Sequence, residues 1–317
     1  MSRSPKVSVV VPTYNYARFL DEAIPSVLNQ TFTDFELIIV DNCSTDNTDA
    51  VVKKYLSDSR VSFYKNETNL GLVGNWNKCL EYATGEYIKF LCADDKFHPQ
   101  ILERFVRIME QHPTIAIVTN YSDIFGEKIG KGRAPFVGLV NGQTVRESML
   151  TPGNRNWLRN PSAVMFRKKD ADAVGLFHPR LFHGTDLEYY LRLLTKGDAY
   201  FVPESLSYTR SHSNAQGALI RKKKYEKIFE RYDFIMIVKN GQPAVTDSMR
   251  SLVDLQVKRR AIRSAAAMYE LLPRLYKKDS RRKFKTAFQI GYTEGVLLTP
   301  LSKYLQWKYI KRLLDKK

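Results

Sequence analysis

The first hundred residues alternate between short apolar runs and stretches whose apolar positions recur at helical spacing. Four runs, at residues 7–11, 35–40, 61–64 and 87–91, have the length and the β-branched or aromatic content of strands. Between them lie amphipathic patterns, the clearest of which puts on one helix face Phe19, Leu20, Ala23, Ile24, Val27 and Leu28. Strands that alternate with helices in this way predict an α/β fold with a doubly wound, mostly parallel sheet.

The pattern changes along the rest of the chain. Further helices and short strands are expected at residues 99–111, 115–119, 163–166, 186–196, 199–202 and 206–209. Residues 125–161, rich in Gly, Pro and Asn, are expected to form loops over one face of the sheet, where acceptor-binding residues are common. From residue 219 onward only helical patterns remain. We therefore expect an α/β domain at 1–217 and a helical region at 218–317.

Two adjacent carboxylates follow the fourth predicted strand. Asp94 and Asp95 come directly after this buried run, where isolated charges are costly unless they meet a cation or hydrogen-bond donors. Ligands bind at the carboxyl edge of an open α/β sheet, so the pair is a candidate site for a divalent metal and the phosphates it carries. Alternatively, the two residues cap the helix that Pro99 helps to start.

Two other strand ends carry polar groups that suit a nucleotide. The first strand is followed by Pro12-Thr13-Tyr14-Asn15, and the second by the segment that begins at Asp41 and ends at Asp46. Both segments should converge with Asp94 at one edge of the sheet. There, Asp41 can accept a hydrogen bond from the imide N–H of uracil or from a base amine. Each of these residues taken alone could equally be a cap or turn residue.

These segments together resemble the family 2 glycosyltransferases of the A-type (GT-A) fold. The resemblance rests on residues 9–15 and 39–46, on Asn69-Leu70-Gly71 with Asn77-Lys78, and on Ala93-Asp94-Asp95, in this order. It covers about residues 5–215. It implies an inverting transfer of a sugar from a nucleotide-diphosphate donor with a divalent metal, Mn²⁺ or Mg²⁺.

The resemblance also implies roles for individual residues. The donor would be bound by Pro12, Thr13, Tyr14, Asn15, Asp41, Asn69, Lys78 and Asp94. Asp94 and Asp95 would hold ribose, metal and diphosphate. Two positions depart from the family pattern: Cys92 stands where an acidic residue is common, and Trp76 stands where an Arg often precedes the matching Asn.

A second acidic motif follows at residues 183–193. It resembles the family's motif ahead of an Arg-Leu helix, with Thr185 in place of the usual Glu. The resemblance implies that Asp186 is the general base, which takes the hydroxyl proton as the acceptor oxygen attacks C1 opposite the leaving diphosphate. Asp186 could instead cap its helix. Glu188 is the weaker candidate, because acidic residues are favoured in a first helical turn anyway.

Residues 208–214 resemble the segment that often closes the active site in this family. Within it, His212 would bind the metal or the diphosphate, since imidazole suits both tasks. The alternative is that His212 lies on the surface, or in the core with its ring nitrogens hydrogen-bonded.

The charge of the chain is concentrated in its last third. The whole chain carries a net charge of +17, and residues 218–317 hold 25 basic and 9 acidic residues, a net of +16. Residues 307–316 have apolar and basic positions on opposite sides of a helix, which suits either a membrane interface or docking on the helix's own domain. Basic runs at 221–224, 258–260 and 281–283 would add attraction to anionic lipid. We hypothesise peripheral attachment that brings the enzyme to a lipid-linked acceptor.

The three cysteines, Cys43, Cys79 and Cys92, are odd in number and have no metal-ligand spacing. This usage fits a reduced, cytosolic setting. Neither an N-terminal signal nor a membrane-spanning segment is expected. We therefore expect a cytoplasmic protein, or one attached peripherally at the inner face of the cell membrane.

The expected function is transfer of a hexose or N-acetylhexosamine from a UDP-sugar to a hydroxyl of a glycan or lipid-linked acceptor, in cell-surface polysaccharide synthesis. A Rossmann dehydrogenase would need Gly-x-Gly-x-x-Gly after the first strand, which is missing. An inactive GT-A-like scaffold and a basic nucleic-acid-binding module are the alternatives, although no recognisable nucleic-acid motif is present and no nucleic acid is expected. The sugar, the acceptor and the oligomeric state stay open.

Overall fold

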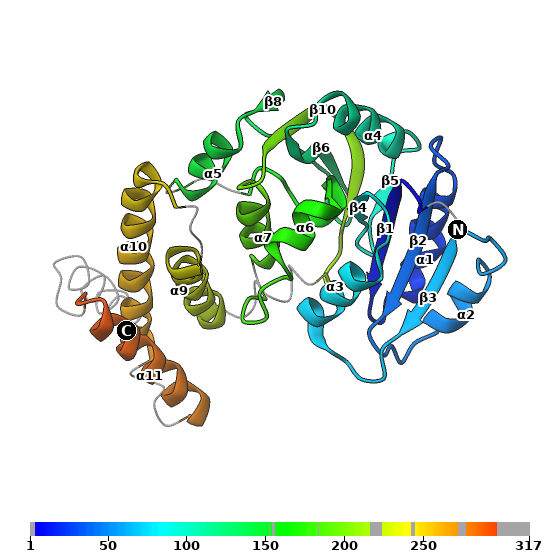
Figure 1. Ribbon diagram of the computed structural model, residues 1–317. Helices are drawn as coiled ribbons and strands as arrows, with labels where there is room; N and C mark the ends of the chain where they lie inside the picture. The colour runs from blue at the N-terminus through cyan, green and yellow to red at the C-terminus, as the bar shows by residue number, and fades with distance from the viewer. Residues whose placement is uncertain are drawn as a thin grey trace. The chain divides into compact units, whose positions relative to one another are not determined.

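The computed structural model describes residues 4–151, 153, 156–182, 184–215, 224–241, 245–271 and 277–296 (Figure 1). The chain separates into two compact units, and each is described by itself. The first comprises Met1–Met149 and Asn154–Ala215, and the second comprises Leu150–Gly153 and Gln216–Lys317.

The first unit is built on one sheet with the strand order β3-β2-β1-β4-β9-β6-β10-β5. Its first four strands run parallel and are β1 (Val7–Thr13), β2 (Phe35–Asp41), β3 (Val61–Lys65) and β4 (Tyr87–Phe90). The other strands on this path are β5 (Lys96–Phe97), β6 (Ile115–Gly126), β9 (Val164–Arg167) and β10 (Asp198–Ser211). β9 is antiparallel to β4 and β6, whereas β6 and β10 are parallel. The predicted α/β fold with a large central sheet is confirmed.

Helices cover both faces of this sheet (Figure 1). They are α1 (Ala17–Leu28), α2 (Thr48–Lys53), α3 (Gly71–Tyr82), α4 (Ile101–Gln111), α6 (Lys168–Val174) and α7 (Thr185–Leu193). Because side chains alternate along a strand, Val9 of β1 packs with Leu20 of α1 and Phe105 of α4 in one buried cluster. The other face carries an aromatic cluster in which Phe90 of β4 contacts Trp76 of α3. Burial on both faces fixes the carboxyl ends of the parallel strands, where the polar segments lie.

The segment predicted as loops, residues 125–161, contains more regular structure than expected. It includes β7 (Gly130–Gly132), β8 (Gly138–Val140) and α5 (Gly142–Leu150), and it ends at the 3₁₀ turn Pro161–Ala163. β7 and β8 are three-residue strands that pair with β6 and β10, so their pairing depends on neighbours distant in sequence and not on local periodicity. The two short strands predicted at 199–202 and 206–209 are one strand, β10, whose register shifts between Val202 and Ser205.

The second unit is helical where it is described, as predicted. It contains α9 (Lys224–Gly241), α10 (Asp247–Leu271) and α11 (Lys278–Thr293). Buried apolar residues, among them Ile235 of α9 and Val257 of α10, lie between the helices. No helix in the described part of the chain is both long and apolar enough to span a bilayer. The basic run at 221–224 and the amphipathic pattern at 307–316 lie outside the described residues or have undescribed side chains.

Candidate active site

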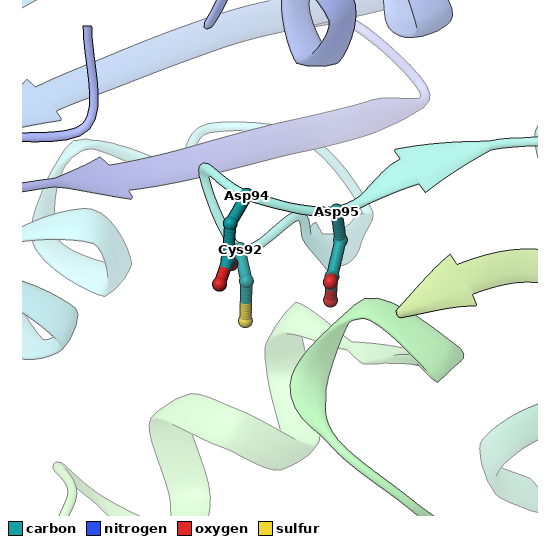
Figure 2. A group of neighbouring side chains, drawn as sticks. All are labelled: Cys92, Asp94 and Asp95. Atoms are coloured by element: carbon teal, nitrogen blue, oxygen red, sulfur yellow. The ribbon is translucent and has the colours of Figure 1, made fainter. Parts of the chain in front are cut away.

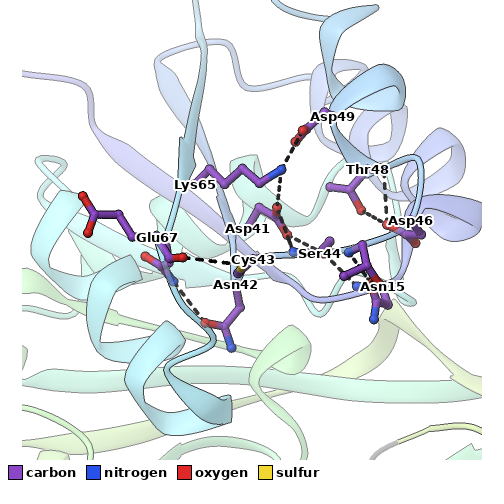
Figure 3. Close-up of polar contacts among 12 residues, drawn as sticks. Asn15, Asp41, Asn42, Cys43, Ser44, Asp46, Thr48, Asp49, Lys65 and Glu67 are labelled. Atoms are coloured by element: carbon purple, nitrogen blue, oxygen red, sulfur yellow. Dashed lines mark hydrogen bonds and ion pairs between the residues drawn. The ribbon is translucent and has the colours of Figure 1, made fainter.

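The ends of β1 and β2 are joined by a network of hydrogen bonds (Figure 3). The Asp41 carboxylate, which is fully buried, accepts hydrogen bonds from the backbone N–H of Ser44 at 3.2 Å and from the Ser44 hydroxyl at 2.5 Å. The Nζ atom of Lys65 lies 3.8 Å from Asp41 Oδ2. Asn15 has a left-handed backbone conformation, with φ of 56°, and its side-chain Oδ1 accepts a hydrogen bond from Thr45 N at 2.8 Å. These contacts hold two of the predicted nucleoside-binding residues, Asn15 and Asp41, at one edge of the sheet.

The other predicted residues of this segment, Pro12, Thr13 and Tyr14, lie at the end of β1 and differ in exposure. Pro12 lies inside β1, beyond the point where pairing with β4 ends at Val10, so its missing N–H leaves no gap in that ladder. The Thr13 hydroxyl is buried and has no hydrogen-bond partner among the described residues. Tyr14 is exposed. A buried hydroxyl without a partner is uncommon, and it marks a position where a bound ligand would supply the missing hydrogen bond.

Asn69 belongs to a network of asparagine side chains beside this edge. Asn42 donates from Nδ2 to Asn69 Oδ1 at 2.8 Å, and Asn66 donates to Asn42 Oδ1 at 3.1 Å and to Asn75 Oδ1 at 2.9 Å. Asn69 Oδ1 also accepts a hydrogen bond from Gly71 N, at the start of α3. The network ties the residue that follows Asp41 to α3. Sequence reasoning missed Asn42, Asn66 and Asn75 in this role.

Lys78 lies away from this network. Its ammonium pairs with Glu81 Oε2 at 2.6 Å on α3 and makes no other polar contact with the described residues. Trp76, two residues earlier, is buried against Phe90 and Phe177. The position where the family often has an Arg is therefore part of the apolar core in this chain. The structure shows no contact between Lys78 and either Asp94 or Asp95.

Cys92, Asp94 and Asp95 form an acidic turn directly after β4 (Figure 2). Their ligand atoms all lie within 4.8 Å of one another. In Figure 2 the side chains of Cys92 and Asp94 lie side by side, and Asp95 is farther along the turn. β5 follows the turn at once, and α4 begins after Gln100 without a side-chain cap. The alternative that Asp94 and Asp95 cap this helix is therefore wrong.

Asp95 is the buried member of the acidic turn, with 2% of its surface exposed. Its Oδ1 accepts a hydrogen bond from Arg210 N at 2.8 Å, and its Oδ2 accepts from Asn160 Nδ2 at 2.8 Å and from Ser162 Oγ at 2.6 Å. Burial, followed by the nearby charge of Asp94, raises the pKa of the Asp95 carboxyl to about 7. Because three donors already bind it, Asp95 joins three segments of the first unit at this turn.

Asp94 is the more open carboxylate, and it meets His212. The His212 Nε2 atom lies 3.0 Å from Asp94 Oδ2, and the side chains are 10% and 16% exposed. The rings of Tyr16 and Phe19 pack against the imidazole, with centroid distances of 5.8 and 4.9 Å. The Nδ1 atom of His212 is buried without a hydrogen-bond partner among the described residues. The structure thus places the predicted His212 beside the acidic turn and excludes an exposed surface position.

This set of donors fits a divalent metal. Asp94 offers a partly exposed carboxylate and His212 an imidazole nitrogen, and both kinds of group are common ligands of Mn²⁺ and similar ions. The Nε2 atom of His212 faces Asp94, so these two side chains would hold a cation together, and Nδ1 is buried without a partner among the described residues. Cys92 adds a thiol in place of the acidic residue that the family often has.

Two basic residues that sequence reasoning missed support the acidic turn. Arg210 donates from Nε to the carbonyl of Asp94 at 2.9 Å, in addition to its backbone contact with Asp95, and pairs with Glu22 at 2.7 Å. Lys89 is fully buried on β4, and its Nζ donates to the carbonyl oxygen of Ser162. Ser162 in turn donates to Asp95 and accepts from Cys92 N at 2.9 Å. A lysine inside an apolar strand was the available signal, because such a residue is rarely buried without a specific partner.

Asp186 lies in the first turn of α7. Its Oδ2 accepts a hydrogen bond from Asn156 Nδ2 at 3.1 Å, and its Oδ1 accepts from Leu187 N at 2.8 Å. The N-cap of α7 is Gly184, with φ of 99°, so the alternative that Asp186 caps the helix is wrong. Burial raises the pKa of the Asp186 carboxyl to about 6. A carboxylate with this pKa can accept a proton close to neutral pH.

The neighbours of Asp186 connect it to the acidic turn. The pKa of the Cys92 thiol is raised well above its ordinary value by burial first, and then by the charges of Asp95, Asp94 and Asp186. Asp186 therefore lies close enough to Cys92 for its charge to act there. Glu188 forms a buried ion pair with Arg192 at 2.7 Å, and this pairing accounts for its place on α7 without a chemical role. Thr185, where the family usually has Glu, is buried.

Sequence comparison identifies the family. The family model for glycosyl transferase family 2 matches residues 8–175. An uncharacterized protein of Mycobacterium tuberculosis is 31% identical over 65% of this chain and 67% of its own length. The putative teichuronic acid biosynthesis glycosyltransferase TuaG of Bacillus subtilis is 30% identical over 67% of this chain and 81% of its own. Poly(ribitol-phosphate) β-N-acetylglucosaminyltransferase TarS of Staphylococcus aureus is 32% identical over 51% of this chain, but over only 29% of its own length.

Solved structures show the same fold. A crystal structure of S. aureus TarS residues 1–349 with UDP-GlcNAc superimposes with a TM-score of 0.60, at 19% identity over 92% of each chain. The mannosyltransferase PcManGT of Pyrobaculum calidifontis, with GDP-Man and Mn²⁺, superimposes with a TM-score of 0.56, at 16% identity over 100% of this chain and 89% of the other. These likenesses confirm the GT-A fold. The family match covers the ends of β1, β2 and β4, whereas Asp186 and His212 lie after it in the chain. The chain belongs to the family 2 glycosyltransferases.

Proposed function

We propose that this glycosyltransferase uses a divalent metal to transfer a hexose or N-acetylhexosamine, with inversion, from a UDP-sugar to an acceptor hydroxyl. The proposal rests on two carboxylates, Asp186 and Asp94, that lie near the same turn in different surroundings. Asp186, with a pKa raised to about 6 and an orienting hydrogen bond from Asn156, lies near Cys92 in the acidic turn. Asp94, with His212 beside it, lies in the same turn. This arrangement suits a base on the acceptor side and a diphosphate site on the donor side.

In this proposal different residues bind the nucleoside, accept the proton and hold the metal. Asp41 accepts the hydrogen bond of the uracil imide, and Thr13 supplies its buried, unpartnered hydroxyl to the nucleoside. Asp186 removes the proton from the acceptor hydroxyl as the oxygen forms its bond to C1 and the bond from C1 to the diphosphate oxygen breaks. Asp94 and His212 would hold the metal, which would neutralise the charge that develops on the leaving diphosphate.

UDP is the proposed nucleotide, since TarS has been crystallised with UDP and with UDP-GlcNAc. PcManGT was crystallised with GDP-Man and Mn²⁺. A GDP-sugar is therefore the competing donor, and Mn²⁺ is the proposed metal. In this proposal the nucleobase of the donor is selected at the ends of β1 and β2, where Asp41 is buried and the Lys65 ammonium lies 3.8 Å from its carboxylate.

The acceptor is proposed to be a glycan or lipid-linked intermediate of a cell-surface polysaccharide. TuaG and TarS are named for teichuronic acid biosynthesis and as a poly(ribitol-phosphate) β-N-acetylglucosaminyltransferase, and they match 67% and 51% of this chain. The net charge of +16 on residues 218–317 supports peripheral attachment at the cytoplasmic face of an anionic membrane, where such acceptors are presented.

Calorimetric titration of UDP, GDP, CDP and dTDP, with Mn²⁺ and then with EDTA, tests the donor class. We expect UDP to bind with Mn²⁺ and to lose affinity with EDTA, and we expect the other nucleotides to bind at least about tenfold more weakly than UDP. Slow release of UDP from UDP-GlcNAc and other UDP-sugars then tests the catalytic site. If no nucleotide binds under any condition, an inactive GT-A scaffold is favoured. The loss of activity would then be assigned to Cys92 and Thr185, which stand where the family has acidic residues.

A further inference from the structure

Four arginines gather where α9 and α10 pack together in the second unit. They are Arg231 on α9 and Arg259, Arg260 and Arg263 on α10, and we call them the arginine cluster. An ion pair of 2.9 Å between Lys239 and Asp254 fixes how the two helices face each other. Arg231 lies about two turns before Lys239, and the three arginines of α10 lie about two turns after Asp254, which brings both sets to the same level of the helix pair.

The arginine cluster has no acidic partner in the described part of the chain. None of its guanidinium groups makes an ion pair or hydrogen bond there, and the Nε atom of Arg260 is buried without a partner. The Ser264 hydroxyl, one turn after Arg260, is also buried without a partner. Apart from burial, the charges that act on Arg260 are all positive, and together with burial they lower its pKa to about 10. Arg231 and Arg260 are partly buried, whereas Arg259 and Arg263 are exposed. Like charges gathered beside a partly buried guanidinium group destabilise a fold unless an anion joins them.

We propose that the arginine cluster is a binding site for a phosphate group. A guanidinium group is planar and donates two parallel hydrogen bonds, and a phosphate has enough oxygens to accept such pairs from several arginines at once. A carboxylate has only two oxygens and one charge, so it satisfies the cluster less fully. The unpartnered hydroxyl of Ser264 supplies a further donor on the same helix face. The phosphate can come from a lipid headgroup or from a soluble phosphate, and the site does not depend on the transfer reaction.

Thermal unfolding of the full chain tests the site. Inorganic phosphate is compared with sodium chloride at matched ionic strength, for the wild type, for Arg260→Gln with Arg263→Gln, and for a control, Lys258→Gln with Arg281→Gln. The control removes two positive charges from exposed positions of the same unit that have no ion pair with the described residues. We expect phosphate to raise the melting temperature of the wild type and of the control by about 5 °C.

The paired variant in the cluster is expected to melt higher than the wild type without phosphate, since like charges are removed, and to lose the phosphate-dependent rise. A higher melting temperature without phosphate also shows that the variant is folded, so the lost response to phosphate is not caused by unfolding. A rise that persists in Arg260→Gln with Arg263→Gln, or that is absent from the wild type, overturns the proposal.

Sedimentation with vesicles of phosphatidylglycerol or of phosphatidylcholine then separates the two sources of phosphate. If the headgroup is the ligand, the paired variant in the cluster loses at least about fivefold more binding to phosphatidylglycerol vesicles than the control does. If a soluble phosphate is the ligand, the two variants bind vesicles equally while only the cluster variant loses the rise in melting temperature. Each result supports the phosphate site and names its source.

Discussion

The Nε2 atom of His212 lies 3.0 Å from Oδ2 of Asp94, although the two residues are 118 positions apart in the chain. β10 ends at Ser211, so the strand delivers the imidazole to the turn that follows β4. Tyr16 and Phe19, from the start of α1, pack against the ring and hold it there. The proposed metal site is therefore assembled from three separate segments of the first unit.

Substitution of His212 by Ala is expected to weaken Mn²⁺-dependent binding of UDP by about tenfold, because Asp94 loses its neighbour and the metal loses a nitrogen ligand. Calorimetry with and without EDTA measures the effect. His178→Ala is the matched control, since His178 makes its side-chain contact with Arg180 and none with the acidic turn. Equal affinities of wild type and His212→Ala would remove His212 from the metal site.

Substitution of Asp186 by Asn should lower the rate of transfer by about 10²- to 10⁴-fold and leave the affinity for UDP unchanged. The amide cannot accept the acceptor's proton, yet it has nearly the shape of the carboxylate that Asn156 holds. The surface variant Asp172→Asn serves as control, because among the described residues its side chain pairs only with Lys168 on the same helix. Full activity in Asp186→Asn would exclude Asp186 as the base.

The same carboxylate predicts a pH profile. Asp186 has to be deprotonated to act as base, and burial raises its pKa to about 6. The rate at saturating substrate should therefore fall as the pH drops through about 6, and should level off above about 7. A rate that stays constant down to pH 4.5 would contradict this assignment.

The parallel half of the sheet could be predicted from sequence for a simple physical reason. Strands β1, β2 and β4 are buried along nearly their whole length, so their sequences are largely apolar runs, and each connecting helix has one apolar stripe. β3 lies at the edge of the sheet and is buried only at Val61, with its last two residues exposed. The strand ends then place Asn15, Asp41 and Asp94 at one edge by geometry alone. Local pattern and tertiary structure agree in this part of the chain.

The supports of the acidic turn could not be predicted in the same way. Ser162, Asn160 and Arg210 reach Asp95 from positions 65 to 115 residues away, and each contact depends on the antiparallel placement of β9 and on the bulged path of β10. No local periodicity encodes such contacts. Residues 125–161 illustrate the same limit, because β7 and β8 exist only through pairing with β6 and β10.

Substitution of Ser162 by Ala tests one of these supports. The change removes the hydrogen bond to Asp95 and leaves the partly buried N–H of Cys92 without its acceptor, so we expect a loss of about 2 kcal/mol of unfolding free energy. Mn²⁺-dependent UDP binding should also weaken, since the turn is no longer held. Ser62→Ala on β3 is the control, because Ser62 makes no side-chain hydrogen bond with the described residues. Unchanged stability and affinity in Ser162→Ala would show that Ser162 does not position the turn.

Asp95 predicts how stability depends on pH in the absence of metal. Its pKa is raised from 3.8 to about 7 in the folded protein, so the folded state binds more protons than the unfolded state between these values. The free energy of unfolding should therefore fall as the pH rises from about 4 to about 7, by up to about 4 kcal/mol from this residue. Denaturant titrations of the wild type and of Asp95→Asn at several pH values measure it. The variant should have a flatter dependence whatever its absolute stability, and an equal slope in both proteins would contradict the prediction.

Cys92 gives the last prediction, which concerns the choice of metal. Its sulfur lies within 4.8 Å of the carboxylate oxygens of Asp94 and Asp95, and its thiol is uncharged without metal because its pKa is raised well above the ordinary value. A thiol ligand favours a soft ion such as Cd²⁺, whereas a carboxylate favours Mg²⁺. Cys92→Asp should therefore bind Mg²⁺ about tenfold more tightly and Cd²⁺ more weakly than the wild type.

Opposite changes for the two ions separate ligation from structural damage, because a disturbed turn would weaken both. A thiolate-to-metal absorption band should appear when Cd²⁺ binds the wild type, with release of the thiol proton, and should be missing in Cys92→Asp. Cys43→Ser should keep the band, because the Cys43 thiol donates to the carbonyl oxygen of Glu67 and makes no other hydrogen bond in the described part of the chain. If Cys92→Asp changes both affinities in the same direction, the thiol takes no part in binding the metal, and Asp94 and His212 remain its proposed ligands.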